Sequence, residues 1–197
     1  IQFSFKNRPS LRLGDYAQID FKTKWHFDFR GFDPPRVNPP GVVTALPVTP
    51  DTFLLTMARM GFKGNVTNYI EFEVEREMRR TFSNNHEYHP WKDNYVNVKA
   101  IPFLHVKAGK FKIPFGMEEN QSDEQRDFAF DSRVSDTLAP SRELGVMLHS
   151  KFLRSARLEY QVGVFRYDGE GSSIHGVPTG DRTYAGRLTG QPLRLIS

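Results

Sequence analysis

Apolar and polar residues alternate along most of this chain, and a period of two is typical of a half-buried β-strand. The clearest stretch is 68–79, where Ile70, Phe72 and Val74 fall on one face. The other face of that stretch carries a run of alternate glutamates: Glu71, Glu73, Glu75 and Glu77. Because a shift of one residue would move every side chain to the opposite face, the alternation specifies the register of this strand strongly.

The same alternation predicts an all-β protein, with segments rich in Asn, Gly and Pro between the strands. Helical spacing is hard to find anywhere in the chain. Eight strands are predicted, at 10–22, 53–62, 68–79, 94–100, 104–112, 143–152, 157–167 and 183–189.

The segments between the predicted strands alternate between long and short without exception. In an up-and-down antiparallel sheet every second connection lies at the same end, so we expect all the tight turns at one end and all the long loops at the other. Outer-membrane barrels have this asymmetry, with short periplasmic turns and longer extracellular loops. The turns are expected to contain Gly64, Pro102 and Ser155, and the long loops Pro39, His86, Asp127 and Gly171.

The two faces of the predicted strands differ as they do in such a barrel. An apolar face would meet lipid, and it includes Leu54, Thr56, Ala58, Met60, Phe62, Val96, Val98, Leu144, Val146, Leu148, Val162 and Val164. The opposite face is too polar for the core of a β-sandwich and would line a water-filled pore. Its candidate pore-lining residues are Arg59, Glu71, Glu73, Glu75, Lys99, Lys107 and Arg187, and we expect the glutamates to pair with Arg59 and Lys99 across the strands.

Aromatic residues near the predicted strand ends, among them Tyr69, Tyr95, Phe103 and Tyr184, fit the aromatic girdles of membrane proteins. A transmembrane helix is excluded, because the longest unbroken run of strongly apolar residues is three and such a helix needs about 20. The chain starts at Ile1 without a signal-peptide pattern, so we expect a mature sequence or an internal segment.

Composition and charge exclude several other classes of protein. Cysteine is absent, which excludes disulfides and thiolate metal sites. The net charge is +4, but Lys and Arg are scattered rather than gathered on one helix face, which argues against nucleic-acid binding. His86 and His89 lie three residues apart without a second group of ligands, which is weak evidence for a metal site. No nucleophile or phosphate-loop motif is present, so we expect no enzyme, no catalytic residue, no metal and no cofactor.

Several stretches of the chain together resemble the phosphate-selective porins of the O and P type. The resemblance runs in order from about Leu11 to Pro192, and its most specific part is GKFKIPFG at 109–116 followed by LAPSRELGVML at 138–148. The remaining parts are MARMGFKG at 57–64, 69–77, YQVGVF at 160–165 and YAGRLTGQP at 184–192.

The resemblance implies a homotrimeric outer-membrane barrel of about 16 strands that passes small ions or solutes, with the third long loop folded inward as a constriction. Residues 1–197 would then form a single barrel domain, or the N-terminal half of one, and the constriction loop would be 113–142. Either the chain is a truncated piece, or its eight strands close by themselves into a small barrel filled with side chains.

The predicted constriction loop is acidic, with seven carboxylates against three arginines and no lysine. Acidic rings favour cations, whereas rings of Arg or Lys favour anions, so we expect a weak anion preference and no tight binding of phosphate. The loop's candidate residues are Glu118, Glu119, Arg126, Arg133 and Arg142. The alternative is a soluble all-β domain that binds carbohydrate or another ligand through exposed aromatic residues.

Overall fold

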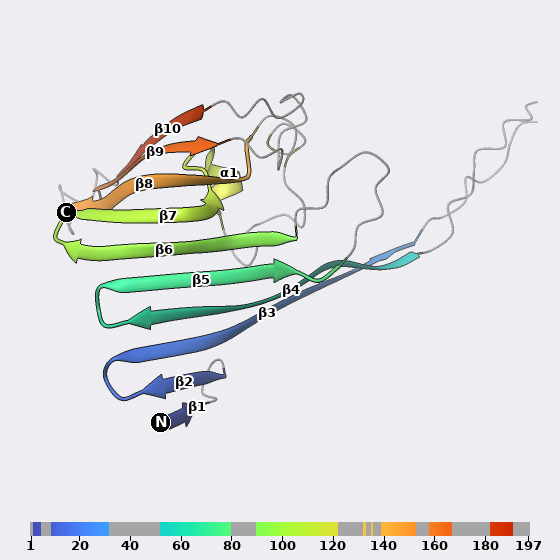
Figure 1. Cartoon of the computed structure of the whole chain (residues 1–197). Coiled ribbons are helices and arrows are strands. Elements are labelled where there is room, and N and C mark those ends of the chain that lie inside the picture. The colour runs from blue at the N-terminus through green and yellow to red at the C-terminus, as the bar shows by residue number, and fades with distance from the viewer. Residues whose placement is uncertain are drawn as a thin grey trace, which may run out of the picture.

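The computed structural model is a single antiparallel sheet whose strands follow one another in chain order (Figure 1). It describes residues 2–4, 9–31, 52–79, 90–121, 132, 135, 139–152, 158–166 and 182–190. Ten strands pair only with their sequence neighbours, which confirms the all-β, up-and-down prediction. The two outer strands do not pair with each other, so the described sheet is open rather than closed into a barrel.

The sheet begins with β1 (Gln2–Ser4), β2 (Ser10–Leu13), β3 (Ala17–Arg30), β4 (Thr52–Val66) and β5 (Ile70–Glu77). It continues with β6 (Trp91–Ile101), β7 (Leu104–Lys112), β8 (Arg142–Phe152), β9 (Leu158–Arg166) and β10 (Arg182–Thr189). The one complete helix among the described residues is α1 (Met117–Asn120), which has four residues. No helix in this part of the chain is long and apolar enough to span a bilayer.

The prediction of eight strands was wrong, because the stretch 10–22 contains a turn that alternation alone does not reveal. The chain reverses at 14–16, where Gly14 has φ 57° and the Tyr16 amide donates a hydrogen bond to the Leu13 carbonyl at 3.3 Å. Glycine adopts this left-handed conformation without steric cost. The segment therefore forms β2 and the start of β3, and β1 adds a further strand that the alternation did not indicate.

The turn predicted around Gly64 lies further along the chain, at 67–69. Gly64 belongs to β4, and a Cβ there would lie 2.6 Å from the Phe72 ring of the next strand, so only glycine fits. The turn predicted at Pro102 is confirmed at 102–103, whereas Ser155 lies outside the described residues.

The predicted asymmetry between the two ends of the sheet is confirmed from β2 to β10, whereas the connection between β1 and β2 is short although it lies at the end where the long loops start. The tight turns at 14–16, 67–69 and 102–103 lie together at the left of Figure 1, and we call this end of the sheet the turn end. The strand ends that border 31–51, 78–90, 113–141 and 167–181 lie at the opposite end, which we call the loop end. Pro39, His86, Asp127 and Gly171 themselves lie outside the described residues.

The strand register gathers apolar side chains into rows that cross the sheet on one face, which we call the apolar face. Residues directly opposite one another in paired strands share a face. One row runs Ile70, Val98, Val106, Leu148, Val162, and a second runs Phe72, Val96, Ala108, Val146, Val164. Most of these side chains stay exposed, Val162 at 57% and Val146 at 51%. Soluble monomers rarely expose a patch of this extent.

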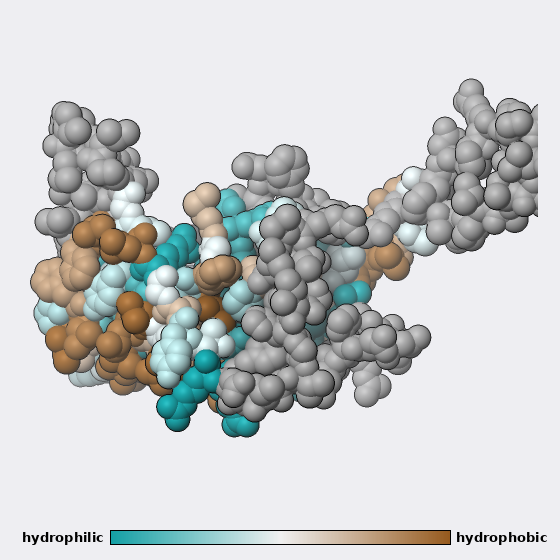
Figure 2. All heavy atoms as spheres, turned by 90° about the horizontal axis from the view of Figure 1, so that it is seen from above, coloured by the Kyte–Doolittle hydropathy of each residue, from teal (hydrophilic) through white to brown (hydrophobic). Residues whose placement is uncertain are grey.

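Seen from above, apolar side chains also gather toward the turn end of the molecule (Figure 2). Tyr69 and Phe103 are exposed at this end, and Phe152 stacks on Tyr160 with ring centroids 4.9 Å apart. These positions agree with a predicted aromatic girdle. Tyr95 does not, because it shares the other, polar face of the sheet with Glu73.

A β-bulge corrects the face assigned to Leu54 and Thr56. The register of β3 and β4 shifts between His26 and Phe27, so that Thr56 has no partner residue. A bulge adds one residue and inverts the alternation beyond it. Leu54 therefore lies opposite Asp28, on the face opposite the one predicted, and Leu55 takes the apolar position opposite Phe27.

The face assignment predicts how two adjacent residues of β9 respond to a buried charge. Val162→Arg should destabilise the protein inserted in lipid by about 2 to 4 kcal/mol, because it places a charge on the apolar face near the middle of the strand. The neighbouring Gln161→Arg, on the polar face, should cost well under half of that. Urea unfolding midpoints measured in liposomes test the pair, and equal losses would contradict the assignment.

Candidate functional site

The polar face of the sheet carries a ladder of charges built on β5. Because side chains alternate along a strand, Glu71, Glu73, Glu75 and Glu77 all project to the same face. The neighbouring strands place basic residues around them, and Glu73 and Glu75 are buried, Glu75 with 1% of its surface exposed. Carboxylates this far from water need cationic or hydrogen-bonding partners to remain charged.

Lys22 of β3 supplies the central cation of this ladder. It forms an ion pair with Glu73, and its Nζ lies 2.9 Å from Oε2 of Glu75. The two strands are not neighbours, so the lysine reaches across β4, where Gly61 is the residue opposite it. The glycine has no side chain to fill that space. The sequence analysis missed Lys22, because it considered pairing only between adjacent strands and the glutamate partners of Lys22 lie two strands away.

Arg59 of β4 continues the ladder toward the loop end. Its Nη1 lies 3.7 Å from Oε1 of Glu75, and its Nε donates to Oε2 of Glu77 at 3.1 Å. Glu77 also accepts a hydrogen bond from the amide of Ala58 at 2.9 Å. These contacts tie the last residue of β5 to the neighbouring strand.

Glu71 closes the ladder toward the turn end. Its carboxylate pairs with Lys99 of β6, and its Oε1 lies 3.2 Å from Nζ of Lys63 on β4. The expected pairing of the glutamates with Arg59 and Lys99 is therefore confirmed. Lys63 is a partner that the sequence analysis missed.

Tyr95 and Lys107 extend this polar face onto β6 and β7. The Tyr95 hydroxyl donates to Oε2 of Glu73 at 2.9 Å, and the ammonium of Lys107 lies 4.3 Å from the centroid of the Tyr95 ring. Lys107 also faces the Phe111 ring at 5.4 Å. Among the described residues, no carboxylate lies within ion-pair distance of Lys107, so its charge is held by aromatic rings instead.

These residues surround a hollow of about 280 Å³ near the loop end. Its basic side chains outnumber its carboxylates among the residues that line it: Lys22, Lys24, Lys107, Lys112 and Arg142 against Glu73 and Asp93. Tyr95, Phe111, Asn120 and Gln121 complete the lining. The hollow is therefore a polar space with an excess of positive charge.

Helix α1 lies over one side of the hollow, because Asn120 ties it back to the chain that precedes it. The Asn120 amide donates to the carbonyls of Ile113, Phe115 and Gly116 at 2.9, 2.8 and 3.0 Å. Lys112 lies beside the helix as well, with its Nζ 3.9 Å from Oε1 of Glu119.

The described acidic residues of the predicted constriction loop have local partners. Glu118 accepts hydrogen bonds from the amide and hydroxyl of Ser132, both at 2.7 Å, and from Ser135. Glu119 accepts from the Ser141 hydroxyl at 3.0 Å. These bonds fold the start of the loop onto its own later part.

Arg142 ends the loop at the sheet, where its Nη2 donates to Oδ2 of Asp93 at 2.9 Å. The buried guanidinium therefore joins β8 to β6 across β7. Arg126 and Arg133, the other two arginines predicted for the constriction, lie outside the described residues.

An apolar cluster lies beside the hollow on the same face as the charged ladder. Phe111, Ile113, Met147 and Phe165 are buried there, and the Phe111 and Phe165 rings meet edge to face at 5.5 Å. The sequence analysis expected a polar face throughout and missed this cluster. Phe111, Met147 and Phe165 take polar-face register positions, and Ile113 directly follows the end of β7. Alternation does not distinguish a pore wall from a surface on which a loop packs.

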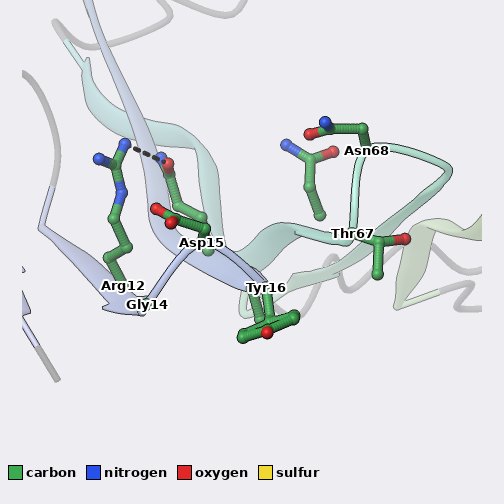
Figure 3. A pocket seen from close by; sticks show the side chains of 9 residues that line it. Arg12, Gly14, Asp15, Tyr16, Thr67 and Asn68 are labelled. Atoms are coloured by element: carbon green, nitrogen blue, oxygen red, sulfur yellow. Dashed lines mark hydrogen bonds between the residues drawn. The ribbon is translucent and has the colours of Figure 1, made fainter.

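A second hollow, of about 350 Å³, lies at the turn end (Figure 3). The turns at 14–16 and 67–69 form its rim, and on one side of it Nη2 of Arg12 donates to Oε1 of Gln18 at 3.0 Å. Arg187 lies on the same face of the sheet, opposite Gln161 and far along the strand order from this hollow.

The family model described as phosphate-selective porin O and P matches residues 21–194, which is most of the chain. No curated protein and no solved structure matches the chain significantly.

The ladder predicts that Lys22 contributes more to stability than Lys63. Lys22→Met should destabilise the folded protein by about 3 kcal/mol, because it leaves two buried carboxylates short of a cation. Lys63→Met should cost about 1 kcal/mol or less, since the Lys63 side chain is 39% exposed and Glu71 keeps Lys99. Urea unfolding of the detergent-solubilised variants compares the two, and an equal loss would show that the burial of the pairs does not matter.

Proposed function

The chain belongs to the phosphate-selective porin O and P family, and from that premise we propose that it forms a water-filled channel for passive diffusion of small ions and solutes across the cell outer membrane. The family is one of outer-membrane porins, which are channels rather than enzymes. The channel wall in this proposal is the polar face of the sheet.

One observation carries the proposal: the sheet has an exposed apolar face opposite a charged face. Lipid covers apolar rows such as Val98, Leu148 and Val162 without cost, whereas water would not. The alternative, a soluble domain that binds carbohydrate, has less support. It would leave these rows in water, and the rows offer a sugar few hydrogen-bonding groups.

The pairing of charges supports a weak preference for anions. The carboxylates of the β5 ladder are matched by Lys22, Arg59, Lys63 and Lys99, so they contribute little net field to a passing ion. The hollow beside them keeps an excess of basic groups, and basic side chains in a pore favour anions. Glu118 and Glu119 would favour cations if they faced the pore. In this proposal, their hydrogen bonds with serines hold the two carboxylates against the loop instead.

The proposal assigns the pore wall to the residues expected from the sequence: Arg59, Glu71, Glu73, Glu75, Lys99, Lys107 and Arg187. To these it adds Lys22, Lys63 and Tyr95, which the ladder includes. The loop 113–142 is proposed as the constriction, and a homotrimer as the assembly, as is implied by the family resemblance. Phosphate is proposed as one permeating anion that the channel does not bind tightly.

The ion selectivity of the proposed channel should depend on Lys107 more than on Lys22, Lys63 or Lys99. Those three lysines pair with glutamates, whereas Lys107 faces aromatic rings. Lys107→Glu should lower the ratio of chloride to potassium permeability by more than tenfold, because it changes the charge by two units, each is worth about 1 kcal/mol at 4 Å in water, and about 1.4 kcal/mol corresponds to a factor of ten. Reversal potentials under a KCl gradient across planar bilayers measure the ratio.

The matched control is Lys151→Glu, which makes the same change at the turn end, where the Lys151 side chain is 78% exposed. A strong anion preference that survives Lys107→Glu but is abolished by Arg126→Glu or Arg133→Glu would contradict the proposal. It would place selectivity at the loop arginines.

The orientation of the sheet is tested with single cysteines, since the native chain has none. With the loop end outside the cell, a membrane-impermeant thiol reagent should label Gly171→Cys on intact cells and spare Asn68→Cys in the turn 67–69. Both variants should react after the cells are lysed. If only Asn68→Cys were labelled on intact cells, the turn end rather than the loop end would lie outside the cell.

A further inference from the structure

The charges on the apolar face are of one sign and lie at one end. Of the paired register positions that β2–β10 give this face, none is acidic. Lys112 and Arg142 also take such positions at the loop end, but they turn toward Glu119 and Asp93 on the polar side. The remaining basic residues are Arg76, Lys110, Arg166 and Arg182.

Three of these basic residues share one row. The register connects Lys110 to Leu144, Leu144 to Arg166, and Arg166 to Arg182, across β7 to β10. We call Lys110, Arg166 and Arg182 the basic row. Arg76 lies at the same end on β5, stacked over the Trp91 ring at 5.2 Å.

The basic row lies at the border of the apolar face. The next row toward the turn end is the apolar one that holds Ala108, Val146 and Val164. Leu158 begins β9 at the turn end, eight residues from Arg166, and at about 3.3 Å per residue that is about 26 Å along the strand, or about 20 Å of height at a strand tilt of about 40°. The lipid-facing apolar band of an outer-membrane barrel is about 25 Å tall. The basic row therefore lies where such a band ends.

The Arg166 and Arg182 pair carries an electrostatic cost that an anion would remove. The two arginines lie directly opposite each other in β9 and β10, and both are exposed. Like charges directly opposite one another destabilise a strand pair. No carboxylate among the described residues forms an ion pair with either arginine. An anion bound between the two guanidinium groups would convert this repulsion into attraction.

We propose that the basic row binds the phosphate groups of a phosphorylated outer-leaflet lipid of the lipopolysaccharide type. The guanidinium fork matches the geometry of a phosphate, and the acyl chains of the lipid would lie on the adjoining rows around Val146 and Val164. Among the described residues the turn end has no counterpart, because its apolar-face positions include Val66, Ile70, Leu104 and Leu188. The site therefore serves one leaflet only. It rests on the proposed outer-membrane location, with the loop end outside.

Binding of purified lipopolysaccharide to the full-length porin in detergent tests the proposal. The wild-type protein should bind phosphorylated lipopolysaccharide about tenfold more tightly than the same lipid with its phosphates removed. The double variant Arg166→Gln and Arg182→Gln should lose that difference, whereas Arg166→Lys with Arg182→Lys should keep part of it. Lys151→Gln, a loss of one charge at the turn end, should bind as the wild type does.

Each opposite result overturns the proposal. The proposal is wrong if the double Gln variant binds phosphorylated lipopolysaccharide as tightly as the wild type does. It is also wrong if the wild type binds the lipid equally tightly with and without its phosphates. Full competition by millimolar inorganic phosphate would show a site for a free anion, and stronger binding to phosphatidylglycerol vesicles would place the row in the other leaflet. Conductance of the same preparations in planar bilayers separates the two ideas. If the protein did not conduct ions but still bound the lipid in a phosphate-dependent way, the channel proposal would be wrong and the lipid site would be supported.

Discussion

Backbone hydrogen bonding without water is the constraint on which the rest of this structure depends. In the apolar part of a bilayer a free N–H or C=O costs several kcal/mol, so every strand must pair along its length. Continuous pairing fixes the register, and the register with its period of two separates the side chains into two unlike faces. The apolar rows and the charged ladder are therefore two results of one hydrogen-bond pattern.

The charged ladder adds a second requirement to the same sheet. Glu73 and Glu75 are buried on the polar face, and a buried carboxylate is stable only with cations or donors around it. Lys22, Arg59 and Tyr95 meet this need from three different strands. The ion pairs thus hold the strands in register, and in the proposed channel they cancel negative charge that would otherwise repel anions.

Much of the fold could be predicted from the sequence, because alternation and loop lengths are local properties. Ile70, Phe72 and Val74 were placed correctly, as were the pairs of Arg59 and Lys99 with the glutamates. Features that need a long-range partner could not be predicted in this way. The bulge at Thr56 exists only relative to β3, and the roles of Lys22 and Asp93 follow from strands two places away in the sheet. The turn at Gly14 was missed because alternation continues on both sides of it.

The order of the strands also has a consequence for how the sheet assembles. Each described strand pairs with the strands just before and after it in the chain, and tight turns such as 67–69 and 102–103 close several of these pairs. Closing a short loop costs little chain entropy, so successive hairpins can form in sequence, each on the edge left by the one before. The open edges at β1 and β10 are the exception. Joining strands that are far apart in the chain has the largest closure entropy, so this step is expected to be the slow one.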